Sequence, residues 1–253
     1  MLKTERMDRV RAALRAQGLT QMIVCDPKSV WYLTGVAVEP YERLLALYLP
    51  TEGEPVLFLN RLFNVPELPC RTVWHTDTDK PVAQIAEVVD AGRPLGIDKE
   101  WPAKFLIPLM ETHPGMQVVL SSDCVDDCRA CKDAEEQALM REASRINDTV
   151  NEAAKHYIKA GMTEREVAEF IDAQFRAHGC EGPSFTTIVS FGANAADPHH
   201  EPDDTVLKEG DCVLFDMGCV KSRYCSDMTR TWFCGQPTEK QAAVHDLVRR
   251  ANE

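Results

Sequence analysis

The sequence predicts an α/β domain over residues 1–122, followed by an α+β region over residues 123–253. Two observations favour this fold class. In the first part of the chain, short apolar runs typical of strands alternate with helical patterns, as they do in α/β domains. A polar segment, residues 121–137, then interrupts the alternation and is followed by a long helical pattern. We therefore place the domain boundary in that segment.

The elements of the first domain follow from apolar periodicity and from turn residues. A helix is expected from Thr4 to about residue 17, because Met7, Val10 and Leu14 share one face and Gly18 can end it. Strands are expected over residues 21–25, 29–35, 44–50, 53–60, 94–98 and 117–121, and further helices over residues 81–90 and 102–111.

The second region opens with a helix whose apolar positions recur every three or four residues, namely Leu139, Ala143, Ile146, Val150, Ala153 and Tyr157. Thr163 and Glu166 form a capping box that begins the next helix. A strand over residues 185–192 and a polar loop over residues 194–204 come next, and two strand-like runs follow within residues 213–233. Thr238 and Gln241 form a second capping box, which begins a last helix.

Composition excludes several classes of function. With 28 Lys and Arg against 40 Asp and Glu, the formal net charge is −12, and such an acidic chain repels nucleic-acid phosphates. No apolar run is long enough to cross a membrane. The N-terminus is charged from its third residue and lacks the apolar core of a secretory signal. A cytoplasmic protein is therefore expected.

The chain has 10 cysteines, and Cys124, Cys128 and Cys131 lie close enough in sequence to suggest part of a zinc site. A structural zinc site usually needs two paired sets of ligands, and the single C-x-x-C pair has no matching pair at zinc-finger distance. We therefore favour reduced thiols in a cytosolic protein, some of them serving as small core residues.

Two aspartates, Asp216 and Asp227, stand inside the two strand-like runs of residues 213–233. Lys221 and Ser222 lie midway between them. A hairpin centred there would place the two aspartates directly opposite each other, with their Cβ atoms about 4.5–5.5 Å apart. Like charges at that separation destabilise a sheet, so something must neutralise the pair.

Three arrangements would neutralise two opposed aspartates. Lys or Arg could form ion pairs with them, or one carboxyl could keep its proton, as in paired-carboxylate catalysis. Divalent metal could also lie between them, in the two-metal arrangement used for hydrolysis. Alternatively, the register is shifted and both aspartates are ordinary surface residues. Spacing alone leaves all four interpretations open.

Two histidines precede these strands, His199 and His200, in the loop of residues 194–204. A lone histidine is usually structural, but a pair in a polar loop ahead of a strand with an inward aspartate suggests a functional site. A neutral imidazole there could bind metal or substrate, or transfer protons.

Four consecutive motifs resemble a known family. They are Ser-Phe-x-x-Ile-Val from Ser184, Pro-His-His from Pro198, Gly-Asp-x-Val-Leu-x-Asp-x-Gly from Gly210, and Ser-Asp-x-Thr-Arg-Thr from Ser226. In this order the motifs resemble the pita-bread metallopeptidases, which include prolidase, aminopeptidase P and creatinase. The Asp-Pro-x-x-x-x-Tyr-Leu-Thr-Gly run from Asp26 is similar to part of the family's creatinase-like N-terminal domain, so the resemblance covers the whole chain.

The resemblance implies a role for each matching residue. Asp216 matches a metal ligand of one ion, and Asp227 matches a ligand that bridges two ions. His199 matches a histidine that lies near the substrate and assists catalysis. Thr229 and Arg230 match positions that support the strand. The family's cofactors are two divalent ions, either manganese, cobalt, iron or zinc, and oxygen and imidazole ligands suit all four.

The family completes its metal site further along the chain with a histidine in a Gly-His-Gly context and two glutamates. After Asp227 this sequence has only Glu239, Asp246, Glu253 and His245, all in or beside the last helix. Two carboxylates alone hold a divalent ion weakly. We expect a fragment or incomplete record of a longer enzyme; a truncated gene product, or a second chain that supplies the rest, are the alternatives.

The resemblance therefore predicts an incomplete pita-bread domain over residues 123–253. The function it implies is a metal-dependent exopeptidase that cleaves short peptides, with proline after the scissile bond, and that forms a homodimer. One alternative is a non-catalytic pita-bread module that binds peptides or proteins. A metal-free amide hydrolase like creatinase is disfavoured, because that branch lacks the two aspartates.

Overall fold

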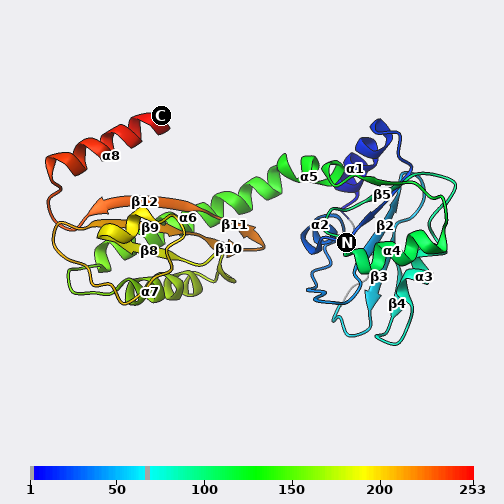
Figure 1. The fold of residues 1–253 in the computed structure, drawn as a ribbon, viewed down its shortest axis with the longest axis horizontal. Helices are drawn as coiled ribbons and strands as arrows, with labels where there is room; N and C mark the ends of the chain where they lie inside the picture. Colours follow the sequence, from blue (N-terminus) through cyan, green and yellow to red (C-terminus); the bar gives the residue numbers. More distant parts are fainter. Residues whose placement is uncertain (1–2, 66–68) are drawn as a thin grey trace. The chain divides into compact units, whose positions relative to one another are not determined.

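A computed structural model describes residues 3–65 and 69–253, and the chain divides into two compact units, Met1–Lys132 and Asp133–Glu253. Figure 1 shows the two units, each with its own strands and helices. The expected boundary after residue 122 lies just before helix α5 (Asp123–Ala130). Because α5 packs against helices of the first unit, the contacts divide the chain after that helix instead.

The first unit is built on a six-stranded sheet with the strand order β4-β3-β2-β1-β5-β6. Strand β1 runs antiparallel to β2 and parallel to β5, so the sheet is mixed. The strands are β1 (Gln21–Val24), β2 (Ala46–Pro50), β3 (Val56–Asn60), β4 (Arg71–His75), β5 (Leu95–Ile97) and β6 (Val118–Leu120). All but β4 correspond to strands expected from the sequence.

Helices cover both faces of this sheet, as the α/β prediction requires. On one face Met22 and Val24 of β1 pack with α5, α1 (Thr4–Ala16) and α2 (Pro27–Thr34). On the other face Ile23 packs with α3 (Pro81–Ala86) and α4 (Ala103–Thr112). Alternate residues of one strand therefore enter two separate apolar cores, which is why the strand is continuously apolar from Met22 to Val24.

The strand expected over residues 29–35 is wrong, because this segment lies in helix α2. The side chain of Asp26 caps the helix by accepting a hydrogen bond from the Ser29 N–H at 2.9 Å, and Pro27 occupies the first turn. Gly35 ends the helix with a φ of 76°, in the left-handed region. The local capping residues outweigh the β-propensity of Val30, Trp31 and Tyr32.

The second unit begins with two helices, α6 (Ala134–Tyr157) and α7 (Glu164–Ala177). The capping box of Thr163 and Glu166 is present as predicted, and Asp133 and Glu136 form another at the start of α6. Tyr157 stacks on Phe170 with their ring centroids 3.9 Å apart, which joins the end of α6 to α7. Figure 1 shows α7 lying along strand β8.

Two small sheets follow, with the orders β12-β9-β8 and β11-β10-β7. Their elements are β7 (Gly182–Pro183), β8 (Ile188–Phe191), the 3-10 helix η1 (Gly192–Ala196), β9 (Cys212–Met217), β10 (Cys219–Lys221), β11 (Tyr224–Cys225) and β12 (Met228–Phe233). Val189 of β8 and Phe215 of β9 pack with Ile171 and Phe175 of α7 in one buried core.

Helix α8 (Glu239–Asn252) begins with the predicted capping box of Thr238 and Gln241. None of its residues is buried. Its apolar side chains Val244, Leu247 and Val248 are 53%, 59% and 62% exposed. Throughout residues 3–65 and 69–253, no helix is long and apolar enough to span a membrane.

Candidate functional site

Residues 212–233 form one long antiparallel hairpin. Strand β9 pairs with β12 from Cys212 opposite Phe233 to Met217 opposite Met228, and β10 pairs with β11 beyond that ladder. The tip is a two-residue turn at Ser222 and Arg223, whose φ values of 49° and 67° are both positive. Such a pair of left-handed residues makes a type I′ turn, which matches the twist of the flanking strands.

The predicted hairpin is present, but its predicted register is wrong. The turn is centred one residue later than expected, so each partner moves by two residues and Thr229, instead of Asp227, lies opposite Asp216. The sequence offered no Asn-Gly or Asp-Gly signal, because the turn uses two residues that rarely adopt positive φ. Thr229 Oγ1 donates a hydrogen bond to Asp216 Oδ1 at 2.7 Å.

Asp227 lies between the two ladders, immediately before β12. Because Ser226 N–H donates to the Cys219 carbonyl at 2.9 Å, the same register continues there and places Gly218 level with Asp227. By strand alternation Asp227 then lies on the same face as Asp216. The two residues are diagonal neighbours, whose Cα atoms are about 7–8 Å apart in such a ladder. The carboxylates therefore avoid the close like-charge contact that direct opposition would impose.

The face that carries Asp216 is opposite the helix-covered core. Val213, Phe215 and Met217 enter the core against α6 and α7, so Leu214 and Asp216 point to the other side of β9. Asp216 is half-buried there, while Asp227 is exposed. This face, with β9 at its centre, is the candidate site.

Gly218 allows two segments of the chain to pass close to each other beside Asp227. A Cβ atom at this position would lie 2.0 Å from the Ser226 carbonyl oxygen and 2.3 Å from Ser184 Oγ. Ser184 N–H donates to the Gly218 carbonyl at 3.0 Å, and its hydroxyl donates to the Ser226 carbonyl at 2.8 Å. Only glycine allows this approach, which fixes the backbone on which Asp227 stands.

The histidine loop, residues 192–206, follows β8 and begins with η1. His199 is exposed, and its backbone N–H donates to Asp197 Oδ1 at 3.0 Å. His200 instead turns toward the start of α7, where its Nε2 lies 2.6 Å from Glu164 Oε2. The structure thus gives the two neighbouring histidines different surroundings, and only His199 faces solvent.

Glu164, His200 and Asp203 bring one ligand atom each within 4.8 Å of one another, the only such metal-sized group of acids, histidines or cysteines in the described part of the chain. Glu164 nevertheless has four N–H neighbours, two on each oxygen. A carboxylate has about four lone-pair positions, so none remains for a cation. Hydrogen bonds from the Thr205 hydroxyl and N–H lower the pKa of Asp203. We interpret this group as a hydrogen-bonded anchor.

The cysteines are the other side chains that the sequence suggested as metal ligands. All 10 are free thiols, and no cysteine belongs to a metal-sized group among the described residues. In α8, Asp246 pairs with Arg249 at 2.8 Å and with Arg250 at 3.0 Å, and Glu253 pairs with Arg249 at 2.6 Å. Asp246 and Glu253 therefore form ordinary surface ion pairs along one helix.

Asp216 and Asp227 are the residues that fit a divalent cation. In the described part of the chain, Asp216 accepts a single hydrogen bond, from Thr229, and Asp227 accepts none, so both keep free lone pairs. Hard carboxylate oxygens suit divalent ions such as manganese. The diagonal spacing leaves room for cations between the two side chains, whereas two carboxylates fill only part of a coordination shell.

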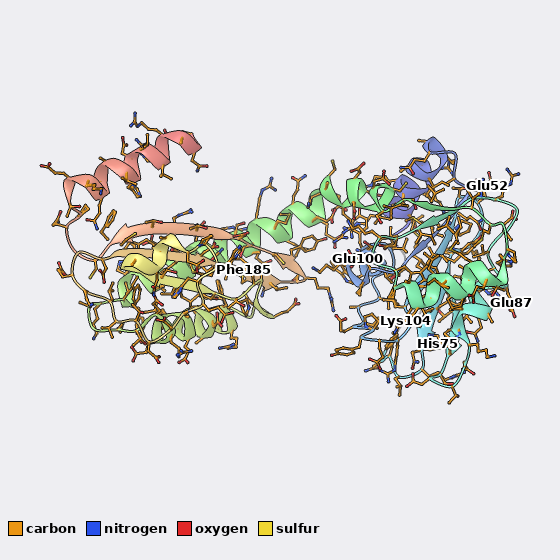
Figure 2. All side chains as sticks on the ribbon, in the orientation of Figure 1. Glu52, His75, Glu87, Glu100, Lys104 and Phe185 are labelled. Carbon is orange, nitrogen blue, oxygen red and sulfur yellow. The ribbon has the colours of Figure 1, made fainter. Side chains whose placement is uncertain are left out.

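Sequence reasoning missed two buried polar residues, one bonded to the histidine loop and one on the face of Asp216. Glu164 is fully buried, although glutamate is almost never so. It lies inside the predicted capping box beside Glu166, so in the sequence it resembles an ordinary exposed acid at a helix N-terminus. Ser190 is fully buried in β8 on the face of Asp216, and its hydroxyl has no hydrogen-bond partner among the described residues. No sequence signal distinguishes this serine. Phe185, labelled in Figure 2, lies in the segment between β7 and β8.

Comparison with known proteins identifies the class. Residues 138–253 match the metallopeptidase family M24, and residues 6–131 match the creatinase/prolidase N-terminal domain. The two matches lie on either side of the boundary that the contacts define. The chain belongs to the metallopeptidase family M24, and the pita-bread fold expected from the motifs is confirmed.

Curated relatives support this assignment. An uncharacterized peptidase of Staphylococcus aureus is 33% identical over 237 residues, which are 90% of this chain and 66% of the relative. One from Staphylococcus epidermidis is 30% identical over 246 residues, 96% of this chain and 70% of the relative. The chain thus spans about two thirds of the length of these relatives.

Solved structures share the fold. Dipeptidase PepE from Mycobacterium ulcerans superposes with a TM-score of 0.89 at 30% identity, over 98% of this chain and 69% of that one. A recombinant prolidase from Thermococcus sibiricus gives a TM-score of 0.88 at 29% identity, over 99% and 71%.

Proposed function

We propose that the whole protein is a metal-dependent exopeptidase that hydrolyses short peptides, with proline after the scissile bond. The observation that carries this proposal is the pair of unneutralised carboxylates, Asp216 and Asp227, on the face of a family M24 sheet that points away from α6 and α7. Two similar solved structures, a prolidase and a dipeptidase, support the substrate class. The proposal also places the protein in the cytoplasm, because its free thiols suit a reducing compartment. It further includes a homodimer, which rests on the family resemblance alone.

In this mechanism Asp216 and Asp227 would hold two divalent ions, either manganese, cobalt, iron or zinc. When bound, the metal supplies Lewis-acid chemistry to the peptide carbonyl. Thr229 fixes the Asp216 carboxylate through its 2.7 Å hydrogen bond and leaves the second oxygen free. The exposed imidazole of His199 would hydrogen-bond the substrate and exchange a proton with it.

The test compares this 253-residue chain with a form extended through the downstream coding sequence. Calorimetry with Mn²⁺ measures metal binding, and hydrolysis of Xaa-Pro dipeptides measures activity. We expect the extended form to bind Mn²⁺ and cleave the dipeptides. Asp227→Asn should abolish cleavage and weaken binding, while Glu201→Gln, which changes an exposed acid in the histidine loop, should do neither.

An extended form that binds no divalent metal would refute the peptidase proposal. Binding of Xaa-Pro peptides without cleavage, in the presence of Mn²⁺ or Co²⁺, would instead favour a non-catalytic peptide-binding module. The observation in favour of that alternative is that, among the described residues, Asp216 and Asp227 are the only carboxylates on this face of the hairpin, whereas Asp246 and Glu253 pair with arginines.

A further inference from the structure

We propose that Glu164 is a positioning residue that fixes the histidine loop and thereby holds His199 in place. The inference rests on the proposed function for the role of His199, but the anchoring itself does not. Glu164 is the first residue of α7 and is fully buried beneath the loop. A buried carboxylate is costly unless its charge is compensated, so its partners are informative.

Every acceptor position of this carboxylate is filled, one by the last residue of β8 and three by residues of the histidine loop. Oε1 accepts from the Phe191 N–H at 2.7 Å and from Asn194 Nδ2 at 3.0 Å. Oε2 accepts from His200 Nε2 at 2.6 Å and from the Asp203 N–H at 3.2 Å. One side chain therefore joins the beginning, middle and end of the loop. The positive end of the α7 dipole further stabilises the charge.

The backbone of α7 joins the far end of the loop as well. Glu164 N–H donates to the Thr205 carbonyl at 3.2 Å, and Arg165 N–H donates to the Asp203 carbonyl at 3.1 Å. Thr163 and Val206 form an isolated bridge beside them. His199 thus lies in a loop whose two ends are both attached to one helix terminus.

The two histidines then have separate roles. His200 Nε2 lies against a carboxylate oxygen that can only accept, so this nitrogen carries the proton and donates it. His200 is needed only as an N–H donor, and glutamine can donate in the same way. His199 keeps its ring free for substrate. We therefore expect His200→Gln to preserve the anchor that His200→Ala removes.

Glutamine is a poor replacement at position 164, although it has the shape of glutamate. The amide nitrogen of glutamine can only donate, and each of the two carboxylate oxygens of Glu164 already faces two N–H groups. Either orientation of the amide sets donors against donors. Glu164→Gln should therefore release the loop nearly as fully as Glu164→Ala.

Hydrogen exchange on the 253-residue chain tests the anchor without any activity. The backbone N–H groups of Phe191 and Asp203 both donate to Glu164, so their exchange rates measure whether the anchor is intact. We expect Glu164→Gln and His200→Ala to accelerate exchange at these amides by about 10- to 100-fold, because each leaves buried groups unpaired. His200→Gln should restore slow exchange, and His199→Gln and Glu201→Gln should leave it slow.

Activity of the form that cleaves peptides tests the positioning. Glu164→Gln and His200→Ala should lower kcat by about 10- to 100-fold with little change in KM, because a displaced group costs orientation more than binding. His200→Gln should recover most of kcat. His199→Gln should lower kcat although its loop stays protected, and Glu201→Gln is the matched control.

Each outcome decides the matter. Wild-type exchange in both Glu164→Gln and His200→Ala overturns the anchor, and fast exchange with unchanged kcat overturns the positioning role. A His200→Gln variant that is protected but inactive would give His200 a chemical role and overturn the division between the histidines. If Glu164→Gln does not fold, the His200 pair still decides. Full activity in His199→Gln refutes the proposed role of His199, while the exchange data stand.

Discussion

At the scale of single residues, Ser190 is a buried polar group without a partner. Its neighbours in β8, Val189 and Phe191, fill the core, while its own hydroxyl points to the face of Asp216 and finds no hydrogen bond among the described residues. An unpaired buried hydroxyl costs free energy. We expect Ser190→Ala to leave the free energy of unfolding unchanged or to raise it by up to about 1 kcal/mol, as measured by urea denaturation.

Ser184 provides the matched control. Its hydroxyl donates to the Ser226 carbonyl at 2.8 Å, so Ser184→Ala removes a made hydrogen bond and should lower the free energy of unfolding by about 1 kcal/mol. A loss of stability in Ser190→Ala as large as that in Ser184→Ala would show that the Ser190 hydroxyl does have a partner.

Thr229 carries a second prediction at this scale. Its hydroxyl is the single donor to Asp216 among the described residues, and such groups behind a metal ligand typically contribute 10- to 100-fold in affinity. Thr229→Val keeps the shape and loses the donor, so Mn²⁺ affinity measured by calorimetry should fall about tenfold or more. Thr229→Ser keeps the hydroxyl and should bind as the wild type does; equal affinity in Thr229→Val would contradict the argument.

At the scale of elements, the crossing of the hairpin at Gly218 carries the next prediction. A Cβ atom there meets backbone at 2.0 Å, which no side-chain movement can relieve. Gly218→Ala should lower the free energy of unfolding by about 1–3 kcal/mol, measured by denaturant titration, and should displace Asp227. Because Asp227 moves, Mn²⁺ binding should weaken along with stability.

Gly92 is the control for this substitution. A Cβ atom there meets only the side chain of Asp90, at 3.2 Å, and neither glycine has a left-handed φ. Gly92→Ala should therefore be nearly neutral. If Gly218→Ala were equally mild, the hairpin crossing would have to be more adaptable than its contacts indicate.

The elements also show where sequence reasoning succeeds. Helices with explicit capping residues, such as those begun by Thr163 and Thr238, are predicted because the cap chemistry is local. Helix α2 is missed although Asp26 and Gly35 mark its ends, because its β-branched and aromatic residues were given more weight. The hairpin register fails because a turn of Ser222 and Arg223 has no glycine to reveal it.

The site divides in the same way. Asp216 and Asp227 can be found from their motifs, whereas their diagonal relation depends on the turn one residue further along. Glu164 cannot be found from pattern alone, because its four partners come from the end of β8 and from the histidine loop. These segments lie more than twenty residues further along the chain and meet Glu164 only in the fold. Long-range convergence of this kind is what a single sequence does not contain.

At the scale of the whole molecule, the reactivity of each cysteine thiol depends on whether the folded units bury it. Burial raises the pKa of Cys70 and of Cys124 to about 11 and that of Cys180 to about 12, whereas Cys131 and Cys225 are exposed. Only the thiolate reacts with iodoacetamide. At about pH 8 we expect Cys131 and Cys225 to be alkylated first, with the buried thiols much slower.

Labelling of the buried thiols should become faster as the pH rises, because their pKa values are raised. A thiol with a raised pKa stays protonated at pH 8, so its labelling must wait for higher pH or for opening of the core. Mass spectrometry of timed samples assigns each site, and Cys131→Ser with Cys225→Ser should remove the fast phase in native protein. Fast labelling of Cys124 or Cys180 at pH 8 would mean that the core around that thiol opens readily, because both side chains are buried in the folded units.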